Sequence, residues 1–70
     1  MADVPAHITG TVWKIEKKVG EAVKAGDVLV ILESMKMEMP VEAPEDGTVK
    51  EIRCKETQAV NEGDVLVVLG

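Results

Sequence analysis

Residues 4–32, VPAHITGTVWKIEKKVGEAVKAGDVLVIL, align without a gap on residues 41–69, VEAPEDGTVKEIRCKETQAVNEGDVLVVL. Fifteen of the 29 aligned positions are identical, and the longest shared run, GDVLV, begins at Gly26 in one copy and at Gly63 in the other. Two copies are too few for a solenoid, which buries its core by stacking more repeats. The repeat therefore predicts two halves related by a pseudo-twofold axis, each covering the apolar face of the other.

The residues inside the repeat favour strands. Twelve valines, four isoleucines and four threonines make β-branched side chains the dominant type, and these side chains fit strands better than helices. No stretch has helical periodicity. Apolar positions 12 and 15, like positions 49 and 52, are three residues apart, which predicts a β-bulge at the same place in each half. The predicted strands are residues 4–8, 10–15, 22–23 and 28–32, then 41–43, 47–54, 59–60 and 65–69.

These strands predict an all-β fold of about eight short strands in two sheets, packed as a flattened sandwich or barrel. The 70 residues, 1–70, allow one small domain. Cys54 is the only cysteine and His7 the only histidine, so an internal disulfide, a cysteine-rich zinc site and most histidine-based metal and acid–base schemes are excluded, and we do not expect an enzyme. The net charge of −5 disfavours nucleic acid and anionic membranes as partners. Without a long apolar run or a signal sequence, a cytoplasmic location is expected.

Residues 33–40, ESMKMEMP, lie between the two copies. Leaving one apolar strand and entering another within eight residues predicts a β-hairpin, with its centre at Lys36 and Met37. Tight hairpins normally carry Gly, Asn or Asp at the turn, and this tip has none. In a pseudo-twofold fold, the counterpart of the hairpin is the gap between the chain ends. We therefore expect Lys36 to be exposed at the end of the domain opposite to Met1 and Gly70.

The segment Glu33-Ser34-Met35-Lys36-Met37, set between two GTV…GDVL halves, resembles the biotinyl/lipoyl attachment domain family in its biotinyl branch. The resemblance extends from residue 4 to residue 69. It implies a hammerhead of two four-stranded antiparallel sheets, with Lys36 as the attachment point of biotin. Met35 and Met37 would flank the site as recognition residues, and Glu33 would complete the hairpin motif. The two halves align without an insertion, which resembles carriers that lack a protruding thumb.

We expect a free-standing biotin carboxyl carrier that serves a biotin-dependent carboxylase or decarboxylase, and the resemblance implies no catalytic residues. A biotin protein ligase would attach biotin to Lys36, and biotin carboxylase and carboxyltransferase-type proteins would then load and unload the carboxyl group. Two departures from the family pattern stand out. Residues 6–10, AHITG, replace the family's Ala-Pro-Met-Pro-Gly, and Lys17 occupies a usually apolar position whose repeat mate is Cys54.

Two other functions use the same hairpin. A lipoyl carrier would hold lipoate on the same lysine, although lipoyl relatives usually carry Asp-Lys-Ala at this place. An unmodified assembly module would dock a partner through the hairpin.

Four further residues have ordinary structural interpretations. Met35, Met37 and Met39 could be read as soft Cu(I) ligands, but the run includes a cation and no other copper ligand, so no metal site is expected. Met39 is expected to pack inward, Cys54 to be a buried small hydrophobe, His7 to be a strand or surface residue, and Trp13 to cover the bulge.

Overall fold

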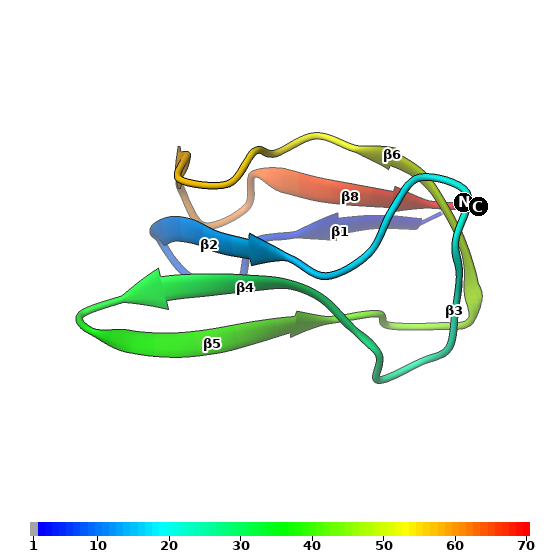
Figure 1. Cartoon of the computed structure of the whole chain (residues 1–70), viewed down its shortest axis with the longest axis horizontal. Coiled ribbons are helices and arrows are strands. Elements are labelled where there is room, and N and C mark those ends of the chain that lie inside the picture. The colour runs from blue at the N-terminus through cyan, green and yellow to red at the C-terminus, as the bar shows by residue number, and fades with distance from the viewer. Residues whose placement is uncertain (1) are drawn as a thin grey trace.

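The computed structural model describes residues 2–70, none of which is helical. They form two four-stranded antiparallel sheets, β1-β8-β6-β3 and β5-β4-β2-β7 (Figure 1). The strands are β1 (Ala2–Pro5), β2 (Gly10–Ile15), β3 (Ala22–Val23), β4 (Val28–Ser34), β5 (Met37–Glu42), β6 (Gly47–Ile52), β7 (Ala59–Val60) and β8 (Val65–Leu69). Over these residues, no helix has the length and apolar character needed to cross a bilayer. The all-β prediction is confirmed.

The hydrogen bonds between the halves follow the predicted pseudo-twofold symmetry. The Ala6 N–H donates to the Asp64 carbonyl at 2.8 Å. The equivalent residues of the repeat form the same bond in the other direction, because the Ala43 N–H donates to the Asp27 carbonyl at 2.8 Å. The short strands are exchanged in the same way, because β7 pairs with β2 and β3 pairs with β6. Each sheet therefore contains two strands from each half.

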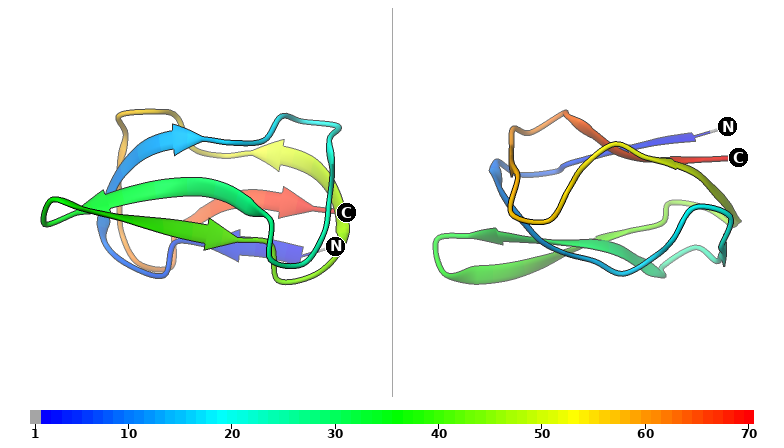
Figure 2. Two further views of the ribbon diagram at one scale, coloured as in Figure 1. Left: turned by 60° about the horizontal axis from the view of Figure 1, so that its bottom comes forward. Right: turned by 45° about the horizontal axis from the view of Figure 1, so that its top comes forward.

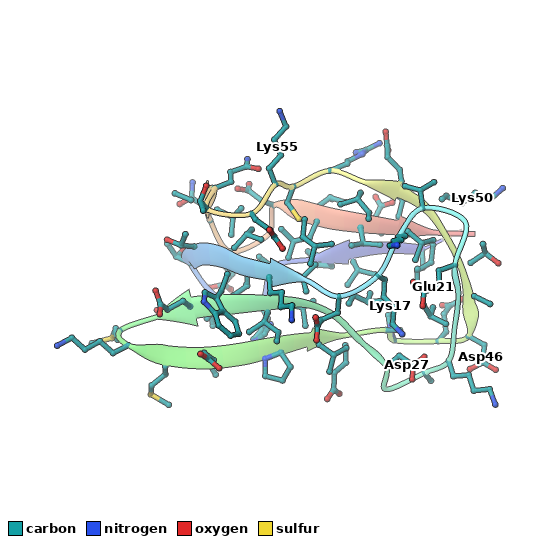
Figure 3. All side chains as sticks on the ribbon, viewed as in Figure 1. Lys17, Glu21, Asp27, Asp46, Lys50 and Lys55 are labelled. Carbon is teal, nitrogen blue, oxygen red and sulfur yellow. The ribbon has the colours of Figure 1, made fainter. Side chains whose placement is uncertain are left out.

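The core lies between the two sheets and contains aliphatic side chains from both halves (Figure 3). Leu29 and Leu32 of the first half and Leu66 and Leu69 of the second are among the largest fully buried side chains. No polar or charged residue within 2–70 is buried. Because the core side chains are small and no buried polar group needs a partner, the two sheets pack against each other over a single apolar layer.

The predicted bulges are present in both halves. The register of β2 on β4 shifts between Val12 and Lys14, and the register of β6 on β8 shifts between Val49 and Glu51. Trp13 is the extra residue at the first bulge and is about half exposed, as predicted. The spacing of three between apolar positions therefore indicated a local break in the two-residue alternation of a strand.

Predicted boundaries are wrong in four strands, among them β4, which ends at Ser34 and not at residue 32. The first strand is Ala2–Pro5 and not residues 4–8, because residues 6–9 bend from one sheet into the other. β5 begins at Met37, well before the predicted residue 41, because it continues the hairpin from β4. β6 ends at Ile52 and not at Cys54, although Cys54 is buried as expected. His7 lies exposed in the 6–9 bend.

The β4–β5 hairpin and the chain ends lie at opposite ends of the molecule, whose longest extent is 30 Å. β1 pairs with β8 so that Ala2 faces Leu69. Two further views show the hairpin extending beyond the other strands at the far end (Figure 2). The predicted position of the hairpin is confirmed.

Candidate functional site: the β4–β5 hairpin

The turn of the hairpin consists of Met35 and Lys36. Ser34 and Met37 form the last pair before it, so the turn lies one residue earlier than predicted. Leu32 pairs with Met39 and not with Val41. Residues 32 and 41, where the two copies of the repeat end and begin, are therefore not opposite each other in the sheet. The prediction placed the turn midway between them, which is one residue too late.

The turn adopts an unusual backbone conformation for its residues. Met35 has φ 53° and Lys36 has φ 65°, and positive φ at both central residues is what a type I′ hairpin turn requires. Left-handed backbone costs an ordinary residue about 1–2 kcal/mol. This local cost is offset by the pairing of β4 with β5, and it marks a place where the sequence departs from the best turn formers.

The side chains predicted to form the site are together and exposed. Met35 is 92% exposed and Met37 is 62% exposed, while Lys36 and Glu33 are also exposed. Met39, opposite the buried Leu32, is half-buried. The two methionines that flank Lys36 thus present apolar surface to solvent, whereas Met39 is half-buried and lies outside the set of residues that pack against the core.

The charges around Lys36 leave its amine unpaired. Glu33 lies directly opposite Glu38 across the hairpin, and like charges in such a pair are destabilising. Among residues 2–70, no ion pair or side-chain hydrogen bond includes Lys36. The hairpin therefore displays a free amine that can accept an acyl group and that forms no ion pair or side-chain hydrogen bond with the described residues.

Gly10, which the sequence did not mark as part of the site, lies against Glu33 and Ser34 close to the turn of the hairpin. A Cβ at Gly10 would lie 2.5 Å from the carbonyl oxygen of Glu33 and 3.4 Å from the Cβ of Ser34. β2 can approach β4 this closely only without a side chain at this position. The identity of Gly10 with Gly47 in the repeat was the available signal.

The described residues include no group of three or more His, Cys, Asp or Glu side chains that could hold a metal ion. The pKa of the Cys54 thiol is raised by burial, because desolvation disfavours the thiolate. The pKa of Arg53 is raised by its hydrogen bond to Glu51. Both groups lie outside the hairpin.

Comparison with known proteins identifies the family. A family model described as "Biotin-requiring enzyme" matches residues 1–69. The biotinylated protein TB7.3 homolog of Mycobacterium leprae is 51% identical over 41 residues, which cover 59% of this chain and 58% of that protein. The matched segment covers less than two thirds of the curated relatives of this chain, for example 6% and 58% of two of them.

Solved structures share the fold. The crystal structure of the Kluyveromyces lactis urea carboxylase has a TM-score of 0.94 and 38% identity, and the match covers 99% of this chain and 6% of that one. The lipoyl domain of the 2-oxoglutarate dehydrogenase complex from Azotobacter vinelandii has a TM-score of 0.75 and 40% identity, covering 89% of this chain and 78% of that one. The chain therefore belongs to the biotin/lipoyl domain family.

Proposed function

We propose that this chain is a biotin carboxyl carrier in which Lys36 holds biotin through an amide bond. The supporting observation is the unpaired, exposed amine at the tip of the hairpin, between the exposed Met35 and Met37. The family description and the biotinylated relative support biotin as the group it holds.

The residues at the tip fit this group. Attachment forms a bond between Lys36 Nζ and the carboxyl carbon of biotin, while a proton leaves the amine and the activating group leaves the carboxyl. The net charge changes from −5 to −6 because one cation is lost. Since no described side chain is placed to remove the proton from Lys36, we expect a biotin protein ligase to supply the activation.

The contribution of the chain to carboxylation is positional. Attached biotin supplies a ureido nitrogen that can take up a carboxyl group and release it. The hairpin carries Lys36 beyond the other strands, which raises the local concentration of the group at partner active sites. Carboxylase relatives support biotin carboxylase and carboxyltransferase-type proteins as those partners. Met35 and Met37 would provide apolar contacts to them.

A lipoyl carrier is the second candidate. The likeness to the Azotobacter vinelandii lipoyl domain favours it, and the same Lys36 amine would hold lipoate. The Met-Lys-Met sequence favours biotin, because lipoyl relatives usually carry Asp-Lys-Ala at this position. An unmodified assembly module would carry neither group.

Intact mass spectrometry of the protein purified from its native host separates these candidates. We expect the mass of one biotinyl group, lost in Lys36→Arg and retained in Lys24→Arg, a matched control at an exposed turn. A lipoyl mass, no addition, or full biotin loading of Lys36→Arg would contradict the proposal.

A further inference from the structure

A cavity of about 420 Å³ lies beside the segment that joins β6, β7 and β8. Val65 gives its wall a partly exposed apolar side chain, Val60 and Leu66 are buried behind this wall, and polar groups make up the larger part of the lining. The lining residues are Arg53, Cys54, Gln58, Val60, Gly63, Asp64, Val65 and Leu66. None of these residues belongs to the hairpin site described above.

The pseudo-twofold symmetry supplies an internal comparison for this cavity. Five of its eight lining residues are identical in the first half, at positions 23 and 26–29. The other three differ: Arg53, Cys54 and Gln58 stand where the first half has Glu16, Lys17 and Glu21. The two halves thus share the walls of this feature and differ in the polar groups at its mouth.

In the first half, an ion pair occupies the equivalent place. The Lys17 ammonium lies 3.5 Å from a Glu21 carboxylate oxygen, and the Lys17 side chain is only 23% exposed. Figure 3 shows Lys17 and Glu21 near β3, away from the hairpin. A long side chain therefore lies along the protein where the second half has the short Cys54.

The cavity lies at the same end of the molecule as Lys36. The β7–β8 segment and the hairpin turn share this end in Figures 1 and 2. Val60 pairs with Gly10, which adjoins Ser34. Val60 lies two strands away from β4, and Lys36 lies two residues beyond Ser34 along the chain. With about 4.8 Å between strands and about 3.3 Å per residue, these steps place Val60 about 12 Å from Lys36. The lysine side chain and the biotin valeryl chain together have roughly ten bonds, which reach about 12 Å when extended.

The polar groups of the cavity match a ureido ring. Gln58 Oε1 accepts from the Lys55 N–H and Asp64 Oδ2 accepts from the Asn61 N–H, so the Gln58 NH₂ and the second Asp64 oxygen remain available. The Arg53 guanidinium uses its Nε on Glu51 and keeps its other donors. A ureido group offers one acceptor and two donors, and its thioether ring is apolar.

We infer that this cavity is a resting site for the biotin ring of an arm attached to Lys36. This inference rests on the proposed function. The ureido oxygen faces donors from Arg53 and Gln58, its N–H groups face Asp64, and the ring lies against Val65, the partly exposed apolar residue of the lining. The first half has no such site, because Lys17 and Glu21 fill its equivalent.

Amide NMR spectra of the unmodified and biotinylated protein test the inference. We expect biotin-dependent shifts at Gln58, Val60 and Leu66, with none at their counterparts Glu21 and Val23. The Lys36→Gln variant removes the charge without adding an arm, and its shifts should stay within residues 33–40. Biotin-dependent shifts confined to 33–40 would overturn the inference.

Exchanging the differing residues gives a matched pair of variants. Cys54→Lys with Gln58→Glu imports the ion pair of the first half, and should abolish the biotin-dependent shifts at Val60. Lys17→Cys with Glu21→Gln makes the reverse change and should leave them intact. Persistence of the shifts in the filled variant would exclude this cavity.

If the variant Cys54→Lys with Gln58→Glu does not fold, the inference can still be tested on the unchanged protein. Alkylation of Cys54, the only thiol, should be at least about twofold slower after biotinylation if the ring occupies the cavity half of the time. Equal rates would count against the resting site. A protein that gains no biotin mass contradicts the proposed function, whereas a biotinylated protein without shifts or protection contradicts only this inference.

Discussion

Burial of the Cys54 thiol links stability to alkaline pH. Cys54 is 5% exposed, and burial raises its pKa above the ordinary value of 9.0. The thiol is then ionised more readily in the unfolded chain than in the folded one. Its contribution to stability is fully present below pH 9.0 and is lost as the pH rises through the raised pKa of the folded state.

We expect Cys54→Val to reduce this alkaline loss. Urea unfolding at pH 7 and pH 10 should show that the original chain loses more free energy of unfolding between the two pH values than the variant does. The two proteins differ only at position 54, so the difference isolates the thiol. An equal loss in both proteins would show that Cys54 does not contribute.

The methionines that flank Lys36 can be separated from the lysine itself. Met35→Asp with Met37→Ala keeps the amine, so biotin attachment should weaken without disappearing. Carboxyl transfer per attached biotin should fall further, because a displacement of about 1 Å can cost on the order of a hundredfold in a positioned reaction. Biotin is quantified by mass, and carboxylation is assayed with equal amounts of loaded carrier. Equal turnover would limit the methionines to attachment or packing.

At the scale of the element, the turn of the hairpin is built from residues that resist its conformation. Met35→Asn should raise the free energy of unfolding by about 0.5–1 kcal/mol, because Asn tolerates left-handed backbone. Met37→Asn is the control, since Met37 lies in β5 without a positive φ. Urea midpoints measure both changes, and no gain in Met35→Asn would refute the strain argument.

The junction of β2 with the hairpin depends on a missing side chain. Gly10→Ala should cost about 1–3 kcal/mol, because the new Cβ would lie 2.5 Å from the Glu33 carbonyl oxygen. Gly47→Ala is the matched control: its Cβ would lie 3.1 Å from the carbonyl oxygen of Gly70, a longer and less repulsive distance than the one at Gly10. Thermal unfolding should rank Gly10→Ala as the less stable variant. Equal stability would mean that β4 gives way without cost.

Much of each element could be predicted from the sequence, because apolar spacing reflects which face of a strand is buried. The three-residue spacing between Val12 and Ile15 located the bulge. The boundaries could not be predicted, because they depend on pairing with distant strands. β5 begins at Met37 only because Ser34 is its partner, and the chain leaves β1 after Pro5 to reach the other sheet.

The candidate site was predictable for a different reason. Lys36 is the one lysine outside the repeat, and a break in a repeat is visible without coordinates. Gly10 and the cavity beside Cys54 depend on contacts between segments far apart in the sequence. Residues 1–70 as a single domain, the cytoplasmic location and the roles of Glu33, Met35, Lys36 and Met37 stay predictions.

At the scale of the whole molecule, the two halves form equivalent backbone hydrogen bonds but differ in backbone strain at one pair of equivalent positions, 20 and 57. The Gly20 N–H donates to the Val49 carbonyl at 2.7 Å, and the Thr57 N–H donates to the Val12 carbonyl at 2.7 Å. Gly20 has φ 93° and Thr57 has φ 72°. The second half therefore places a β-branched residue where the first half uses glycine.

Gly20→Thr should lower the free energy of unfolding by about 1–2 kcal/mol, through the backbone alone. No atom lies within 4 Å of a Cβ at Gly20, so a steric clash does not contribute. Thr57→Gly should not lose stability, because relief of the positive φ offsets the greater freedom of glycine in the unfolded chain. Urea titration of both variants checks the pair, and a tolerated Gly20→Thr would contradict the argument.

The hairpin depends on both halves of the chain, so it becomes stable late in folding. A two-stranded hairpin alone is marginally stable in water, and β4 and β5 bury Leu32 and Val41 in a core that includes Leu66 and Leu69 of the second half. The left-handed turn is therefore held in place only after the halves have joined. For an enzyme that recognises the shape of this turn, a half-made chain offers no substrate. A modification at Lys36 would then be found only on molecules that had finished folding.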